Sequence, residues 1–268
     1  MNIAVCIKQV PDTEEERLRL NGSGTALERD EVPQAMNDFD GYALEAAARL
    51  KDADPSVNII VVTAGPEQAK AVLKNGLSIA ADKAYHVCDG AAAGSDLFAT
   101  ARVIAAALRH IAETEGGIDA VFLGKQSIDG ETGGMAAALS EELDMPMLTN
   151  CLSVECAGGR FRARREIKGG AENYSLTLPC VLSFAKPEYP VRYSNIKRKL
   201  AANRAVIPQL GLADIGVEPA AAGHAASRTH ILSASPVVRD KQCVMVREET
   251  AEDAAAKLAG LLRGEHII

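Results

Sequence analysis

A short polar loop in the middle of the chain carries the residue types with the clearest chemical use. In FLGKQSIDGETGGMAAALSEELDMP, residues 122–146, an apolar strand end leads into a loop with Asp129 and Glu131 and then into an Ala-rich helix. Gly133 and Gly134 stand where that helix should begin. Free N–H groups and the helix dipole at such a start favour phosphate oxygens, and glycines let a ligand approach the backbone closely. The stretch is therefore suited to holding an adenine nucleotide.

Other strand ends are followed by loops of the same kind, KQVPD, TAGP and GSD. In a doubly wound sheet such loops meet at the carboxyl edge, where ligands bind. The sequence contains no GxGxxG, no P-loop GxxxxGK[ST] and no GxSxG, and no Cys has an obvious local His partner. Asp129 and Glu131 are better suited as caps and ribose acceptors than as a catalytic acid pair. An enzyme acting alone is therefore not expected, and no catalytic residue is assigned.

Short apolar runs alternate with helical patterns in the first half of the chain. The predicted strands are NIAVCIK, VNIIVVT, AYHV and IDAVFLG, with helices at 38–51, from about 95, and at about 132–143. Asn37 or Asp38 can cap the first of these helices, and Ser95 and Asp96 are capping candidates for the second. NGSG marks a turn within a polar surface segment, with a small hairpin, between 11 and 36. This alternation predicts an α/β fold with a doubly wound, mostly parallel sheet.

The pattern changes after residue 147. The segment 148–184 has turn signals between β-rich runs and predicts antiparallel strands added to the sheet. From 205 to 247 no strong period is present, and TAEDAAAKLAGLLRG recovers a helix with Thr250 and Asp253 in capping-box spacing. We therefore predict a nucleotide-binding α/β domain at 1–204 and an extended C-terminal arm and helix at 205–268 that pack on a partner.

Composition narrows the function classes. The 268 residues have a net charge of −7, which argues against general nucleic-acid binding. Eleven Lys and Arg against three Asp and Glu give the segment 160–204 a net charge of +8, which is either a solvated face or a docking surface for an acidic partner. The six cysteines lack a CxxC and the five histidines lack metal-ligand spacing, so no disulfide and no metal site is expected. With no apolar run long enough to span a bilayer, a cytoplasmic protein without membrane insertion is predicted.

Several of these stretches resemble one family. The chain is similar over nearly its whole length to the β (small) subunit of electron transfer flavoprotein. IAVCIKQVPDT resembles its opening strand and loop, MNDFDGYALEAAARLK its first helix, and VVTAGPEQA and LGKQSIDGETGG its nucleotide loops. RREIKGGAENYSLTLPCVLSF resembles its signature, and TAEDAAAKLAGLLRGEHII its C-terminal helix.

The resemblance implies an adenine nucleotide alpha hydrolase-like fold and the role of an electron-carrier subunit. Such β subunits pair with an α subunit that carries the redox-active FAD, and the heterodimer passes electrons between flavin dehydrogenases, such as acyl-CoA dehydrogenases, and an acceptor. The β subunit buries a second nucleotide, AMP in ordinary members and FAD in electron-bifurcating ones.

Carried onto this sequence, the resemblance implies two sets of residues. The nucleotide pocket would use Cys6, Asn37, Asp38, Phe39, Asp40, Thr63, Ala64, Gly94, Asp96, Thr100, Gly124, Lys125, Gln126, Ser127, Ile128, Asp129, Gly130, Glu131, Thr132, Gly133 and Gly134. Partner docking would use Glu188, Tyr189, Arg192, Tyr193, Ile196, Lys197 and Leu200, where KPEYPVRYSN departs from the family's usual text.

Three positions in the pocket also depart from the family pattern. GSDLFATA resembles the GADTxATS of bifurcating members, but Leu97 stands in place of a Thr, Gly134 in place of the usual Gln, and Gly133 in place of an Ala or Asn. The lost hydrogen bond would weaken the pocket by about 1 kcal/mol without abolishing it. GSDLFATA favours the FAD-binding, bifurcating-like branch. The alternatives are a stand-alone adenine-nucleotide-binding enzyme or sensor on a related α/β fold, and an interaction subunit whose pocket has decayed.

Overall fold

The computed structural model describes residues 1–12, 20–22, 24, 32–235 and 243–268. By their contacts these residues form two units, Met1–Leu232 and Ser233–Ile268. The larger unit therefore runs past residue 204, where the sequence pattern placed the end of the α/β domain. Residues 205–232 belong to it because β11 (Gln209–Leu210) pairs with the sheet and α6 (Gly223–Ala226) contacts α3.

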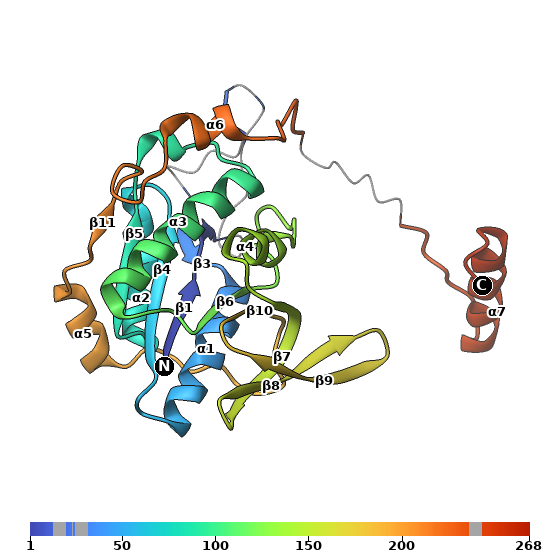
Figure 1. Cartoon of the computed structure of the whole chain (residues 1–268). Helices are drawn as coiled ribbons and strands as arrows, with labels where there is room; N and C mark the ends of the chain where they lie inside the picture. Colours follow the sequence, from blue (N-terminus) through green and yellow to red (C-terminus); the bar gives the residue numbers. More distant parts are fainter. Residues whose placement is uncertain (13–19, 23, 25–31, 236–242) are drawn as a thin grey trace. The chain divides into compact units, whose positions relative to one another are not determined.

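The larger unit is built on one nine-stranded sheet with the order β11-β5-β4-β1-β6-β10-β7-β8-β9 (Figure 1). Its strands are β1 (Asn2–Cys6), β4 (Asn58–Ala64), β5 (Lys83–Val87), β6 (Ala120–Gly124), β7 (Met147–Ala157), β8 (Arg160–Ile167), β9 (Gly170–Thr177), β10 (Cys180–Phe184) and β11. Pairing is parallel from β11 to β7, and β8 and β9 pair antiparallel. The predicted fold class is confirmed.

One strand pairs differently from the prediction. Cys180–Phe184 was expected among the antiparallel strands, but β10 lies between β6 and β7 and is parallel to both. All five residues of β10 are buried. A short, continuously apolar strand of this kind suits the centre of a parallel sheet, and CVLSF carries that signal.

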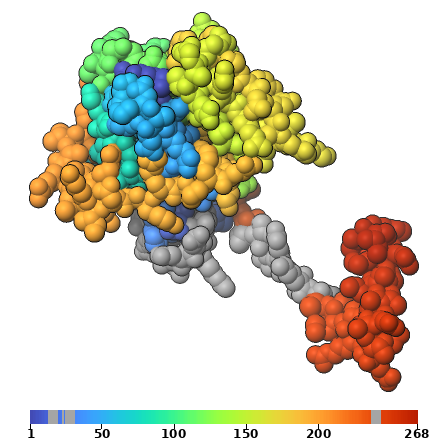
Figure 2. All heavy atoms as spheres, turned by 90° about the horizontal axis from the view of Figure 1, so that it is seen from below, coloured from blue at the N-terminus to red at the C-terminus, as the bar shows by residue number. Residues whose placement is uncertain are grey.

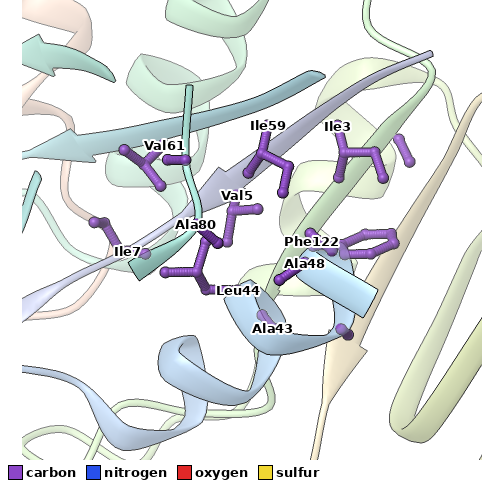
Figure 3. Close-up of a cluster of buried hydrophobic side chains, with 14 of the residues drawn as sticks. Ile3, Val5, Ile7, Ala43, Leu44, Ala48, Ile59, Val61, Ala80 and Phe122 are labelled. Carbon is purple, nitrogen blue, oxygen red and sulfur yellow. The ribbon is translucent and has the colours of Figure 1, made fainter. Parts of the chain in front are cut away.

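Helices cover both faces of the sheet. α1 (Asp38–Ala53) and α2 (Lys70–Ile79), which follows the single turn η1 (Glu67–Ala69), pack on one face. α3 (Leu97–Glu115) and α4 (Met135–Leu143) pack on the other. Figure 3 shows part of the first core, where side chains of β1 and β4 meet Ala43, Leu44 and Ala48 of α1. Small alanines let the helices lie close to the sheet, as the low aromatic content requires.

Helix ends follow the predicted capping residues in part. The Asp96 carboxylate accepts a hydrogen bond from the Ala99 N–H at the start of α3, and Gly116 ends the helix with φ +80°. α4 begins at Met135, three residues after the predicted start, because the loop through Gly133 (φ +63°) is not helical. α5 (Ile196–Arg204) begins at the Asn195 cap.

A second, two-stranded sheet supports the polar surface segment. β2 (Gln9–Pro11) and β3 (Gln34–Met36) pair antiparallel at its two ends, whereas most of the segment in which the small hairpin was predicted lies outside the described residues. The predicted turn at 21–24 closes with a hydrogen bond from Gly24 N–H to Asn21 O at 2.9 Å, although residue 23, like 13–19 and 25–31, lies outside the described residues. The segments η2 (Gly90–Ala92) and η3 (Pro219–Ala221) are single turns.

The smaller unit contains one helix, α7 (Ala251–Gly264), among its described residues. Thr250 caps it, since its hydroxyl accepts a hydrogen bond from the Asp253 N–H at 3.1 Å, as the capping-box spacing predicted. No residue of α7 is buried, and Leu258 and Leu261 are exposed.

Candidate functional site

The loops after β1, β4, β5 and β6 meet at the carboxyl edge of the parallel sheet. Most of the residues predicted to hold a nucleotide lie on these loops or at the start of α1. Two side chains from the start of α1, Asp40 and Asn37, connect the loops to one another. They determine the shape of the candidate site.

Asp40 is a buried carboxylate that joins the ends of two strands. Its oxygens accept hydrogen bonds from the Lys8 N–H at 2.8 Å and the Gly124 N–H at 2.9 Å. Burial raises the pKa of Asp40 to about 7, although these N–H groups act in the opposite direction. Gly124 has no room for a side chain, since a Cβ there would lie 2.5 Å from Asp40 Oδ1 and 2.6 Å from Phe39 Cβ.

Asn37 holds the next part of the loop after β6. Its amide nitrogen donates to Gln126 O at 2.9 Å, and its carbonyl oxygen accepts from the Ile128 N–H at 3.0 Å. The Lys125 ammonium lies 5.0 Å from the centre of the Phe39 ring. The start of α1 therefore positions the loop that the sequence predicted as the main nucleotide segment.

Lys8 is a site residue that the sequence prediction missed. Its ammonium donates to both Asp129 carboxylate oxygens, at 2.7 and 2.9 Å, and lies 3.4 Å from the Ser127 hydroxyl. The side chain of Asp129 is only 6% exposed. A cation directly after an apolar strand, in AVCIK, was the available signal. Asp129, which was predicted as a ribose acceptor, thus forms an ion pair with Lys8. This ion pair fixes the orientation of the Asp129 carboxylate in the loop after β6.

The start of α4 lacks a side-chain cap. Gly134 stands at the N-cap position and makes no side-chain hydrogen bond, Gly133 has φ +63°, and Glu131 has φ +51°. Leu97, at the start of α3, lies against Gly134, because a Cβ on that glycine would be 3.0 Å from Leu97 Cδ2. Two of the three departures from the family pattern, Leu97 and Gly134, are therefore in contact with each other.

The residues at the start of α3 that were predicted to bind the nucleotide already contact other parts of the chain. Asp96 accepts hydrogen bonds from Arg228 N–H at 2.7 Å and Thr229 N–H at 3.0 Å as well as from its own helix. A Cβ on Gly94 would overlap the ring of His224 at 2.1 Å. The Thr100 hydroxyl donates to Ser95 O at 3.4 Å. The segment 223–229 therefore covers this end of α3.

Two residues of the predicted pocket lie at the ends of β1 and β4. Burial, with Asp40 nearby, raises the pKa of the Cys6 thiol to about 12, so this residue can offer only neutral and backbone groups. Thr63 is buried, and its hydroxyl has no hydrogen-bond partner among the described residues. The remaining predicted positions, which the structure brings onto the same edge, are Asp38, Ala64, Gly130 and Thr132.

The predicted docking segment lies far along the chain from α1 but is attached to it (Figure 2). Arg192 donates to Glu45, at 2.7 Å, and to Asp52, at 2.6 Å, and the Arg49 guanidinium lies 3.8 Å from the centre of the Tyr189 ring. Arg192 and Tyr189 are therefore anchors within the chain. The exposed predicted residues are Glu188, Tyr193, Ile196, Lys197 and Leu200.

These features are those of a doubly wound α/β protein whose strand-end loops meet at the carboxyl edge of the parallel sheet. Comparison with known proteins then gives the family. The model of the electron transfer flavoprotein domain matches residues 24–215. The chain belongs to the electron transfer flavoprotein β-subunit family, whose members are electron carriers rather than enzymes.

Curated relatives match along most of their length. The chain is 34% identical over 269 residues to the caffeyl-CoA reductase-Etf complex subunit CarD of Acetobacterium woodii, covering 100% of both chains. It is 34% identical to the electron transfer flavoprotein subunit beta of Megasphaera elsdenii, over 95% of this chain and 94% of that one. Protein FixA of Azorhizobium caulinodans is 35% identical over 81% of this chain and 78% of its own length. Among the described residues, no helix is long and apolar enough to cross a membrane.

Proposed function

We propose that this chain is the β subunit of a heterodimeric electron transfer flavoprotein and holds an adenine nucleotide, FAD or AMP, at the carboxyl edge of its sheet. The observation that carries the proposal is the start of α4. Gly134 leaves the first N–H groups of that helix without a side-chain cap, and Gly133, with φ +63°, precedes it without a side chain. A nucleotide phosphate is the group that such a helix start favours.

The chain's own residues divide the work of binding. Asp40 and Asn37 fix the loop after β6, so little ordering is required when the nucleotide binds. Lys8 holds Asp129 in one orientation, where a carboxylate oxygen can accept from a ribose hydroxyl. A flavin supplies the redox chemistry of the assembled protein, and this chain supplies binding, orientation and the docking surface.

We favour FAD over AMP in this subunit. Leu97 brings the start of α3 against the start of α4, so the GSDLFATA loop and the GETGG loop adjoin. FAD is a dinucleotide and therefore longer than AMP, so it would contact both the GSDLFATA loop and the GETGG loop. This adjacency supports the bifurcating-like assignment that the sequence of the α3 loop suggests.

We further propose that Tyr193, Ile196 and Leu200 face a flavin dehydrogenase, and that α7 packs on the α subunit. Tyr193 and Ile196 are exposed by 95% and 81%, which is unusual for large apolar side chains without a partner. All six cysteines are free, which suits a reducing compartment such as the cytoplasm.

The flavin content of the heterodimer tests the proposal. The chain is co-expressed with its α subunit, purified and denatured, and the released flavin and AMP are counted per heterodimer. Two flavins would support FAD in this subunit, one flavin with one AMP would support AMP, and one flavin with no second nucleotide would mean that the pocket has decayed. A colourless monomer would contradict the subunit assignment.

Asp129→Asn is the matching variant. Losing one charged hydrogen bond to the ribose should weaken nucleotide retention by about 1.5–3 kcal/mol, roughly ten- to a hundredfold. Asp144→Asn, at the exposed C-terminal end of α4, is the control and should leave retention unchanged. Equal nucleotide content in both variants would remove Asp129 from the site.

A further inference from the structure

Three side chains with metal-ligand chemistry meet at the carboxyl end of β5. Glu67 comes from η1, while His86 lies on β5 and Cys88 directly after it. One donor atom from each residue lies within 4.8 Å of the other two. Residues two apart along a strand share a face, so the spacing His-x-Cys presents both side chains on the side covered by α1 and α2.

His86 has the hydrogen bonding of a metal ligand. Its ring is fully buried, and Nε2 lies 3.1 Å from Gly65 O. A carbonyl can only accept, so Nε2 carries the hydrogen and Nδ1 has the lone pair of a neutral ring. Nδ1 has no hydrogen-bond partner in the part of the chain that the structure describes. Metal-bound histidines typically donate their other N–H to a carbonyl in this way.

A second unsatisfied group lies next to it. Thr63 is the register neighbour of His86 on β4, so the two side chains lie on the same face of the sheet. The Thr63 hydroxyl is also buried without a partner among the described residues. Buried polar groups left unpaired cost about 1–3 kcal/mol each, so the two adjacent atoms are favourable positions for contact with a bound group.

We propose that Glu67, His86 and Cys88 bind one divalent cation of the zinc class, through a carboxylate oxygen, Nδ1 and the thiolate sulfur. Sulfur, imidazole and carboxylate together are a donor set that zinc prefers, with three protein ligands and a water in the fourth position. The bound water would donate to the Thr63 hydroxyl. When the metal binds, the Cys88 thiol loses its proton to solvent. The Glu67 carboxylate then binds the metal in place of the Lys70 ammonium, from which it lies 2.7 Å.

The cluster can close without moving the sheet. Bonds of about 2.0–2.3 Å to a tetrahedral zinc bring donors to roughly 3.3–3.8 Å of one another. Glu67 is exposed on a single helical turn and Cys88 is half-buried just after β5, so rotation of these two side chains can supply the remaining approach to His86.

Local spacing could not predict this site. The sequence pattern led us to expect no metal, because a single His-x-Cys pair is too sparse and Glu67 belongs to a different strand-end loop. The proposal replaces that expectation. It requires neither a nucleotide nor the α subunit.

Cobalt(II) is the test probe. The reduced full-length chain is stripped with a chelator and titrated with Co²⁺, which substitutes for zinc and reports tetrahedral thiolate coordination by a charge-transfer band and visible d–d bands. We expect one Co²⁺ per chain and displacement of the spectrum by Zn²⁺. Absence of the charge-transfer band in the wild-type chain would overturn the proposal.

Variants assign the ligands. Cys88→Ser should abolish the charge-transfer band, whereas Cys156→Ser, on the exposed part of β7, should retain it. Glu67→Gln changes an exposed side chain and should lower Co²⁺ affinity by at least about tenfold without unfolding the chain. A band that survives in Cys88→Ser, or an affinity that Glu67→Gln leaves unchanged, would also overturn the site.

Discussion

At the scale of single residues, the candidate site depends on buried polar groups that connect strand ends. Asp40 bonds to the backbone at Lys8 and Gly124, and Asn37 bonds to the backbone at Gln126 and Ile128. Each contact joins segments more than thirty residues apart. The shape of the edge is therefore determined by α1 as much as by the loops that would touch a ligand.

Asp40 should titrate near neutrality. Burial raises its pKa from 3.8 to about 7, so folding favours the protonated acid. Its contribution to stability is fully present below about pH 4 and is lost as the pH rises through 7. A carboxyl-carbon NMR titration should give a midpoint near 7 for Asp40. Asp54, whose pKa is lowered by hydrogen bonds from Ser56, is the reference, and an Asp40 midpoint as low as that of Asp54 would contradict the assignment.

Gly124→Ala should destabilise the fold. The new methyl group would collide with Asp40 and with the Phe39 backbone, which lies 2.7 Å away, and overpacking of this kind costs about 1–3 kcal/mol. Gly130→Ala is the matched control, since its nearest neighbour is Ser127 Oγ at 3.6 Å. Urea unfolding gives the midpoint of each variant. Equal midpoints would show that Asp40 and Phe39 can move away from the new methyl group at no cost in stability, which would contradict the prediction.

At the scale of elements, the proposed docking segment, residues 188–200, combines residues bound to α1 with the exposed start of α5. Arg192 forms ion pairs with Glu45 and Asp52. A negative charge at position 192 would repel the buried Glu45 carboxylate, so a charge reversal there would report on folding rather than on docking. Ile196 and Leu200 lie one turn apart on α5 and are exposed, so this helix is the part of the segment available to a partner.

Leu200→Ala should slow electron transfer from the partner dehydrogenase without changing stability. Leu200 is 57% exposed in the free chain, so the substitution removes little from the core, but burying it at an interface would contribute about 1.5–3 kcal/mol. Val206→Ala, 94% exposed and outside α5, is the control. Stopped-flow reduction of the heterodimer by the dehydrogenase measures both, and equal rates would exclude α5 from the contact.

Regular elements were largely predictable, because they depend on local patterns. The strands at 2–6, 58–64 and 120–124 and the caps at Asp96 and Thr250 follow directly from hydrophobic runs and capping spacing. The parallel pairing of β10 was not predictable from its neighbours, because it depends on where the chain returns in the sheet. The contacts of Lys8 with Asp129 and of Leu97 with Gly134 join distant segments, so a local pattern can mark Lys8 as a candidate but cannot name the partner of either residue.

At the scale of the whole molecule, the chain consists of a unit with its own core and a C-terminal unit whose described residues form none. Both core clusters lie within Met1–Leu232, whereas α7 exposes its leucines. A helix with an apolar side and no buried residue within its own chain is typical of a segment that packs on a partner.

A chain ending at Leu232 should keep its fold but lose affinity for the α subunit. The free energy of unfolding by urea should match that of the full-length chain, because the core clusters lie entirely before the deletion. Heterodimer formation, measured by analytical ultracentrifugation, should weaken by at least about tenfold, since each leucine buried at an interface contributes about 1.5–3 kcal/mol. Unchanged assembly would show that 233–268 is not an interface arm.

The contact between Leu97 and Gly134 couples the two positions energetically. Gly134→Gln would push a Cβ against a leucine methyl group 3.0 Å away, so the leucine has to shift to admit it. Leu97→Thr shortens the facing side chain and leaves the glycine unharmed. The two substitutions should therefore be non-additive: glutamine at 134 should cost less stability when threonine stands at 97 than when leucine does.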